Sequence, residues 1–118
     1  MSIKGLHAMF YSTQADELRP FFRDKLGLSA TDVGEGWLIF GVPEADLGVH
    51  PTDTTTGPPC GTADISFYTD NIEQTVSEFT ARGVKFTGPA ADHGYGLVTY
   101  LVAPGDLKIQ LYQPKYSK

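Results

Sequence analysis

The sequence predicts an α+β fold in which two paired βαβββ modules form a curved mixed sheet around a cleft, with the helices on the outer face. Three observations lead to this fold class. Strand-like and helix-like hydrophobic patterns follow in the same order in each half of the chain. A segment rich in proline, glycine and threonine, residues 51–61, separates the halves. Short motifs recur across it at nearly one offset, which indicates a repeated module.

The composition is typical of one packed domain. The chain has 118 residues, of which 41% are hydrophobic and 19% charged. This balance favours a packed core over disorder, and the length suits one domain. We therefore expect a single domain over residues 1–118, with module one at 1–55, a linker at about 51–61 and module two at 61–118.

Charge and cysteine content exclude several classes of partner and site. The net charge is −5, from 9 Lys and Arg against 14 Asp and Glu, and no basic run is present, so a nucleic-acid partner is not expected. No apolar run approaches the roughly 20 residues of a membrane span, and the N-terminus is unlike a secretory signal, so no membrane partner is expected. Cys60 is the single cysteine, which excludes an internal disulfide and a Cys-rich zinc site. We expect a cytoplasmic protein.

The repeat aligns residues near both ends of the two halves. A shift of 57 places Phe10 and Tyr11 on Phe67 and Tyr68, and His7 on Asp64. Near the module ends the shift is 60, and it places His50 on Gln110. The three extra residues fit the glycine-rich stretch 88–96, so a duplicated module explains both offsets better than chance similarity.

The first half reads as a strand, a helix and further strands. Residues 3–11 form the expected first strand, and Thr13 is the expected N-cap of a helix that ends at Gly27. Pro20 lies inside this helix and is expected to bend it or delay its start, because proline lacks a backbone donor. Residues 37–41 and 46–50 are the expected later strands.

The second half repeats this order. Residues 63–69 form a strand, and Asp70, with Glu73 three residues on, is the expected N-cap of a helix that ends at Gly83. Strands are expected at 84–87, 96–102 and 107–113, with a turn at Pro104 and Gly105 between the last two.

Alternation along these strands separates an apolar face from a polar face. The expected helix-covered face is apolar throughout, as in Phe67, Ile109 and Leu111. The opposite faces of the first and last strands of each module carry His7, His50, Asp64 and Gln110. Two half-sheets related by a pseudo-twofold axis would bring these four residues toward one shared cleft.

The chain resembles the vicinal oxygen chelate superfamily, which includes glyoxalase I, fosfomycin-resistance proteins, extradiol dioxygenases and bleomycin-binding proteins. The resemblance covers essentially the whole chain. It rests on five segments in order, GLHAMFYS, FFRDKLGL, DLGVHP, ADISFYTDNIE and APGDLKIQLYQP. It implies two βαβββ modules around a cleft, and in metal-dependent members a divalent ion held by the first and last strands of each module.

The resemblance implies a metal set of His7, His50, Asp64 and Gln110. Glyoxalase-like members typically have His or Gln, then Glu, His and Glu at these places, so only His7 is of the commonest type. Two imidazoles and a carboxylate suit Fe, Mn, Ni or Zn, and no organic cofactor is implied. Asp64 is either a ligand or a catalytic base. The alternative is a hydrogen-bonded network of these four residues without an ion.

Aromatic and polar strand residues are expected to line the cleft. They are Met9, Tyr11, Trp37, Ser66, Tyr68, Tyr100 and Tyr112. Each aromatic alone could simply pack, but an apolar wall with a polar floor is typical of small-ligand sites. His93, in the insertion AADHGYG, is either an exposed loop residue or part of a lid over the cleft.

Two main functions follow, and both take a small-molecule ligand. The first is a glyoxalase-like enzyme that binds a molecule with adjacent oxygens through a divalent metal and acts as a lyase, isomerase or dioxygenase. The second is a metal-free binding or sequestration protein of the bleomycin-resistance type, whose acidic surface suits cationic ligands. A stand-alone regulatory or assembly module is a third reading. A homodimer is expected in each case, because a small cupped sheet leaves edges to cover.

Overall fold

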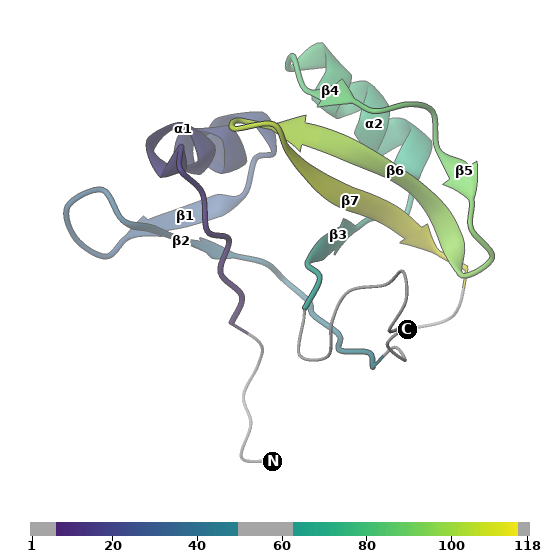
Figure 1. Ribbon diagram of the computed structural model, residues 1–118, viewed down its shortest axis with the longest axis horizontal. Coiled ribbons are helices and arrows are strands. Elements are labelled where there is room, and N and C mark those ends of the chain that lie inside the picture. Colours follow the sequence, from purple (N-terminus) through teal and green to yellow (C-terminus); the bar gives the residue numbers. More distant parts are fainter. Residues whose placement is uncertain (1–6, 50–62, 116–118) are drawn as a thin grey trace.

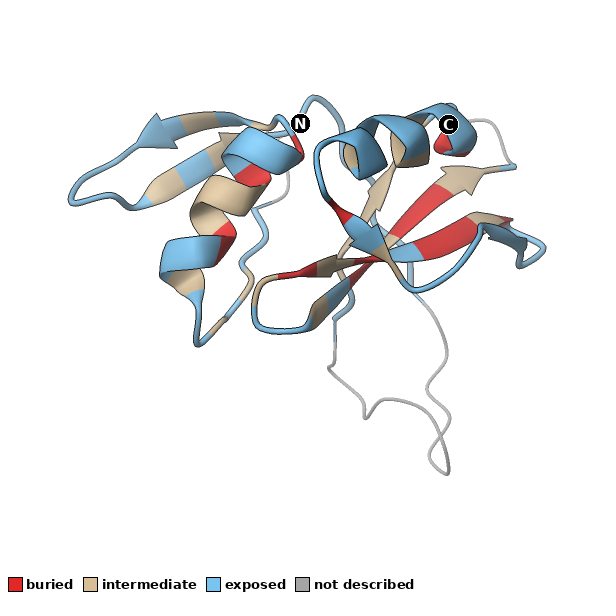
Figure 2. Ribbon diagram, turned by 90° about the horizontal axis from the view of Figure 1, so that it is seen from above, coloured by how far each residue is buried: buried red, intermediate tan, exposed pale blue. Residues whose placement is uncertain are grey.

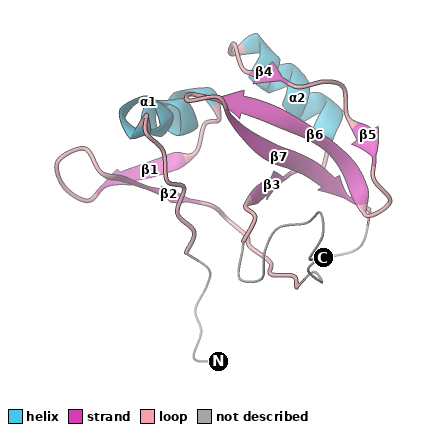
Figure 3. Ribbon diagram, in the orientation of Figure 1, coloured by secondary structure: helices cyan, strands magenta, loops and turns pink. Residues whose placement is uncertain are grey.

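The structure is a computed structural model that describes residues 7–49 and 63–115. Figure 1 shows its elements along the chain and Figure 3 separates helices from strands. The elements in order are α1 (Ala15–Pro20), the π-helical turn η1 (Phe21–Lys25), β1 (Ser29–Asp32), β2 (Leu38–Gly41), β3 (Ser66–Tyr68), α2 (Ile72–Ala81), β4 (Lys85–Phe86), β5 (Ala91–Asp92), β6 (Gly96–Ala103) and β7 (Leu107–Pro114). The fold is α+β, as the sequence predicted.

The second half forms a five-stranded mixed sheet. The order along the sheet is β3-β7-β6-β4, and β5 pairs with β6 off this path. β3 runs parallel to β7 and the other pairs are antiparallel. The helix α2 lies along one face of this sheet (Figure 1). The expected order of a strand, a helix and three strands is therefore present here, with β5 as an additional short strand that the sequence pattern did not indicate.

The first half departs from the predicted module. Residues 7–12 and 43–49 form no strand, whereas strands were predicted at 3–11 and 46–50, whose residues 3–6 and 50 lie outside the described part. The strand β1 was not predicted, and it pairs with β2 in a two-stranded hairpin. A strand needs a hydrogen-bonded neighbour, and no described strand pairs with either segment. Their apolar side chains are exposed, with Leu47 at 82% and Val49 at 97%.

Both helix starts differ from the predicted caps. The N-cap of α1 is Gln14, which makes no side-chain capping bond, so Thr13 is not the cap. The N-cap of α2 is Asn71, whose side-chain oxygen accepts from the Gln74 amide at 3.1 Å, so Asp70 lies one residue too early. Capping requires the oxygen to reach the third helical amide, and only Asn71 has that spacing here.

α1 begins at Ala15, before Pro20, so the predicted delay of the helix start is wrong, and Pro20 instead lies where the α-helix changes to a π-helix. It ends α1, and the chain continues as the π-helical turn η1, in which the Leu26 amide donates to the Phe21 carbonyl five residues earlier at 3.2 Å. Proline has no amide hydrogen, so the regular four-residue pattern is interrupted at this point. A π-turn accommodates one extra residue in a helix, and it keeps Phe22 and Leu26 buried.

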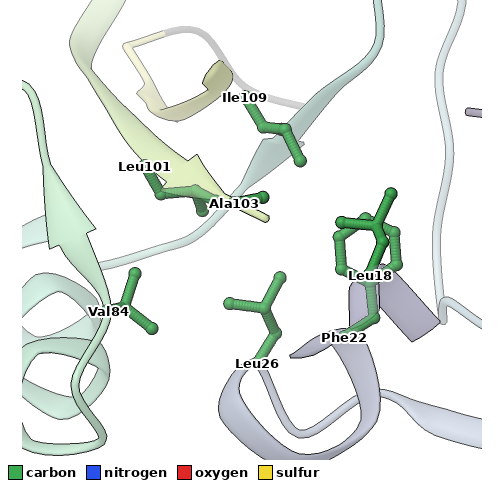
Figure 4. Packing of buried hydrophobic residues seen from close by; sticks show 7 residues of the cluster. All are labelled: Leu18, Phe22, Leu26, Val84, Leu101, Ala103 and Ile109. Carbon is green, nitrogen blue, oxygen red and sulfur yellow. The ribbon is translucent and has the colours of Figure 1, made fainter. Parts of the chain in front are cut away.

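The core lies between α1 and the sheet of the second half. Figure 2 shows buried positions on the inner side of α1 and along β6 and β7. Figure 4 shows seven buried side chains converging there, namely Leu18, Phe22, Leu26, Val84, Leu101, Ala103 and Ile109. Three come from the first half and four from the second, so the two halves share one core. The proposed linker at 51–61 lies outside the described residues, and the module boundaries remain a prediction.

Residues 57 positions apart meet between the two halves. The Lys25 ammonium donates to the Arg82 carbonyl at 2.7 Å, and the Arg82 guanidinium donates back to the Lys25 carbonyl at 3.2 Å. The rings of Phe10 and Phe67 also meet, with centroids 6.5 Å apart. Contacts between equivalent residues are expected near a pseudo-twofold axis, and 57 is the offset of the sequence repeat. Each cation also neutralises the negative end of the other helix.

Candidate functional site

One face of the sheet carries most of the polar and aromatic strand residues. The register pairs Ser66 with Gln110, Tyr68 with Tyr112, and Tyr100 with Gln110, so these five side chains share a face. Alternation along β7 places Ile109 and Leu111 on the other face, where both are buried. The predicted separation into a polar and an apolar face is confirmed for this sheet.

Gln110 is the hydrogen-bonding centre of this face. Its side-chain oxygen accepts from the Ser66 hydroxyl at 3.0 Å. Its side-chain nitrogen donates to the Tyr95 hydroxyl at 3.1 Å and to the Tyr100 hydroxyl at 3.2 Å. Both ends of the amide are therefore engaged by the protein, and three side chains are held around one strand position.

Tyrosine rings surround this centre. The Tyr68 and Tyr112 rings lie 6.1 Å apart, and the Tyr95 ring meets Tyr112 edge to face at 5.8 Å. His93 meets Tyr95 at 6.3 Å, also edge to face. These separations fall in the range of favourable aromatic pairs. We call the surface formed by Ser66, Tyr68, Tyr95, Tyr100, Gln110 and Tyr112 the tyrosine face.

Tyr95 reaches this face from the turn between β5 and β6. Asp92 stabilises that turn by accepting from the Gly94 amide at 2.8 Å and by pairing with the Lys115 ammonium. The hydrogen bond from Lys115, and after it the bond from the Gly94 amide, lowers the pKa of the Asp92 carboxyl below its ordinary value. The ion pair between Asp92 and Lys115 ties the end of β7 to the turn that carries Tyr95.

The loop after β2 approaches the tyrosine face from the first half. The Tyr68 hydroxyl donates to the Glu44 carboxylate at 2.6 Å. Charge-assisted hydrogen bonds of this length are stronger than neutral ones. A residue from module one thus contacts the strand that opens module two, as a site shared between the modules requires. The sequence did not single out Glu44.

The predicted metal ligands are only partly described. His7 and Asp64 are exposed and lie outside helices and strands, whereas Gln110 lies within β7. His50 lies outside the described residues. Over residues 7–49 and 63–115, no group of three or more His, Cys, Asp or Glu side chains could hold a metal ion. The donor chemistry of Gln110 also fits hydrogen bonding better than coordination, because its oxygen already accepts from Ser66. The described residues therefore do not make a metal site.

The predicted cleft residues divide into two groups. Ser66, Tyr68, Tyr100 and Tyr112 meet on the tyrosine face. In contrast, Met9 and Tyr11 lie in the segment before α1 and are exposed, Tyr11 at 91%. Trp37 precedes β2 at the hairpin turn, where the Arg19 guanidinium lies 4.6 Å from its ring centroid. Figure 1 shows that turn at the far side of α1 from β5.

Sequence reasoning missed Tyr95, although it singled out the insertion around His93. The available signal was the pattern DHGYG, in which Asp92 and Gly94 form a turn that returns the chain into β6. Recognising that turn would have placed Tyr95 beside the first residue of β6. The contact of Tyr95 with Gln110, which is far along the chain, required the tertiary structure.

Solved structures with this fold cover nearly the whole chain. TnmS3, an antibiotic binding protein from Streptomyces sp. CB03234, is 21% identical with a TM-score of 0.65, covering 98% of this chain and 99% of that one. A lactoylglutathione lyase from Agrobacterium tumefaciens is 16% identical with a TM-score of 0.63, covering 96% and 94%. A superfamily member from Sphaerobacter thermophilus is 22% identical with a TM-score of 0.62, covering 96% and 99%. Because all three sequence identities are below 25%, the structural similarity shows the fold of this chain and nothing about its activity.

Three further findings concern the chain. No curated protein matches the chain. Among the described residues, no helix has the length and apolar character of a membrane span. The model of the Glyoxalase/Bleomycin resistance protein/Dioxygenase superfamily matches residues 5–110, which is most of the 118-residue chain. The chain therefore belongs to the Glyoxalase/Bleomycin resistance protein/Dioxygenase superfamily.

Proposed function

We propose that this protein binds a small aromatic molecule on the tyrosine face without a metal ion. The observation that carries the proposal is the set of tyrosine rings arranged around Gln110, whose amide oxygen accepts from Ser66 and whose amide nitrogen donates to Tyr95 and Tyr100. Large rings offer apolar contact area at low entropic cost, and their hydroxyls orient a ligand. This is the second of the functions expected from the sequence.

Accessibility supports binding at this surface. Tyr95 is 45% exposed and Tyr100 is 37% exposed, although both rings are fixed by contacts with neighbouring side chains. Partly exposed rings that are already ordered lose little entropy when a ligand covers them. TnmS3, which has the same fold, is described as an antibiotic binding protein, so the fold is compatible with this kind of function.

The metal-dependent enzyme remains the competing function. It requires His7, His50 and Asp64 to meet, and a metal would then polarise a substrate with adjacent oxygens. Its ligand set stays a prediction, since His50 lies outside the described residues. Stabilisation by Mn, Ni, Zn or Fe ions that is lost in His7→Ala would support this lyase, isomerase or dioxygenase and contradict the metal-free proposal.

Thermal shift measurements test the metal-free proposal directly. We expect 2-acetylnaphthalene or the cationic 1-naphthylmethylammonium to raise Tm by about 3–6 °C at tenfold excess over Kd in the presence of a chelator. Tyr95→Leu should remove most of this shift. The control Tyr11→Leu also removes a tyrosine ring, but from an exposed position outside the sheet, and it should retain the Tm shift. An equal loss in both variants, or no shift in the wild type, would refute binding on the tyrosine face.

We also propose a homodimer in which the second copy covers the open segments of module one. Leu47 and Val49 are exposed there, and the outer edge of β3 pairs with no described strand. Exposed apolar residues and an unpaired strand edge each favour association with another chain. We expect light scattering to give twice the chain mass, and Leu47→Asp to give one chain mass. Val33→Asp, a matched change at the exposed hairpin turn, should leave the dimer intact, and a monomeric wild type would contradict the proposal.

A further inference from the structure

The hydrogen bonds of Gln110 leave two hydroxyl hydrogens unused. The amide nitrogen has two hydrogens and donates one to Tyr95 and one to Tyr100. Each phenol oxygen therefore acts as an acceptor in these bonds. Among residues 7–49 and 63–115, no group accepts a hydrogen bond from either hydroxyl. The two O–H groups remain available to donate.

The two available donors lie close together. Both phenol oxygens contact one nitrogen, at 3.1 and 3.2 Å, so they sit on either side of a single atom. Both side chains are partly exposed. Each ring is also held, since Tyr95 packs on Tyr112 and Tyr100 stands opposite Gln110 in the ladder. The hydroxyls are thus positioned before any ligand arrives.

We infer that Tyr95 and Tyr100 form a donor site for an acceptor oxygen of the bound aromatic molecule, and that the ligand is an aromatic ketone or related carbonyl compound. This inference rests on the proposed function and specifies its ligand class. Two convergent donors match the two lone pairs of a carbonyl oxygen. A neutral carbonyl suits this surface better than a carboxylate, because the chain carries a net charge of −5.

Gln110 is the positioning residue of this site. Its nitrogen fixes each phenol as an acceptor and thereby directs both O–H groups outward. The substitution Gln110→Glu would reverse the arrangement, because a carboxylate accepts hydrogen bonds and would draw both O–H groups inward. The Ser66 hydroxyl can still donate to the introduced carboxylate, as it does to the amide oxygen. Gln110→Glu is therefore expected to turn the two tyrosine O–H groups toward position 110 while the rings of Tyr95 and Tyr100 stay in place.

A pair of matched probes tests the inference. In 2-acetylnaphthalene a C=O group stands where 2-isopropenylnaphthalene has C=CH₂, so the two differ in hydrogen-bond acceptance at nearly constant shape. We expect the wild type to bind the ketone about tenfold more tightly by calorimetry, because the alkene leaves two desolvated donors unpaired. The ¹³C resonance of the ketone carbonyl should also move downfield on binding, as it does when the oxygen accepts hydrogen bonds.

Four variants test whether the ketone preference comes from the two phenol donors and from Gln110, or only reflects a general loss of stability. Tyr100→Phe and Gln110→Glu should each reduce the ketone preference to about twofold or less while both probes still bind. The control Gln113→Glu introduces the same charge on β7 but on the helix-covered face, where its oxygen accepts from the Ile72 amide, and it should keep the preference. Tyr95→Phe should behave as Tyr100→Phe does.

The possible results distinguish failure of the inference from failure of the proposed function. If the wild type binds ketone and alkene equally, the tyrosine face binds aromatics but the donor site is wrong. If Gln110→Glu keeps the full preference, the preference does not depend on the direction that Gln110 gives to the two O–H groups, and the inference is also wrong. If neither probe binds the wild type, the proposed function and the inference both fail.

Discussion

Replacing Phe22 with alanine should lower the free energy of unfolding by about 3–5 kcal/mol. Phe22 is 7% exposed, and its ring contacts four other phenylalanine rings, from Phe10, Phe21, Phe40 and Phe67. Three of these contacts lie within the first half, and the fourth reaches β3 in the second. The substitution removes a large apolar side chain and leaves a cavity at the junction of the two halves. Urea denaturation followed by circular dichroism measures the loss.

Phe79→Ala is the matched control for this prediction. Phe79 lies 57 positions after Phe22, at the equivalent point of α2, but it is only partly buried and has no ring contact with another described aromatic residue. We expect a loss of about 1–2 kcal/mol, because less apolar area is removed from contact. Equal losses in the two variants would show that the aromatic cluster does not hold the halves together.

Gly96→Ala is expected to have the second large effect, about 1–3 kcal/mol of unfolding free energy. A β-carbon at this position would lie 2.5 Å from the backbone oxygen of Gln113 and 3.3 Å from the Tyr112 ring. Backbone cannot move aside as a flexible side chain can, so the first residue of β6 would have to separate from the end of β7. Because Tyr95 precedes Gly96, the tyrosine face should be displaced as well, and binding of aromatic probes should weaken.

Gly88→Ala separates this steric effect from a general cost of replacing glycine. No atom lies within 4 Å of a β-carbon built on Gly88, which precedes β5, and its backbone is not in the left-handed region. This variant should match the wild type in thermal unfolding or be slightly more stable, because alanine restricts the unfolded chain. A Gly96→Ala protein that unfolds at the same temperature as Gly88→Ala would contradict the close approach at Gln113.

Local patterns predicted most elements of the second half of the chain, although not the short strand β5. Alternation along residues 107–113 predicted both β7 and the faces of its side chains, and the ladder with β6 confirms them. The helix of this half was predicted with only its cap displaced, from Asp70 to Asn71. These features depend on neighbours close in the chain, or on a hairpin closed by Pro104 and Gly105, so short-range chemistry specifies them.

The same patterns failed in the first half for a physical reason. The segments around Tyr11 and Leu47 alternate as strands do, but a strand exists only where another strand completes its hydrogen bonds. Sequence alternation describes one partner and contains no information about the other. The described residues offer no such neighbour, so these segments form no strand and the hairpin β1–β2 pairs only with itself.

The candidate site shows the same division. The sequence alone determined the family, the α+β class and the polar strand face that carries Ser66, Tyr68, Gln110 and Tyr112, because these follow from the order and period of residue types. The tertiary structure decided what Gln110 does. Its hydrogen bonds to Tyr95 and Tyr100 depend on the β5–β6 turn and on strand register, and no local pattern encodes contacts between residues that far apart in the chain.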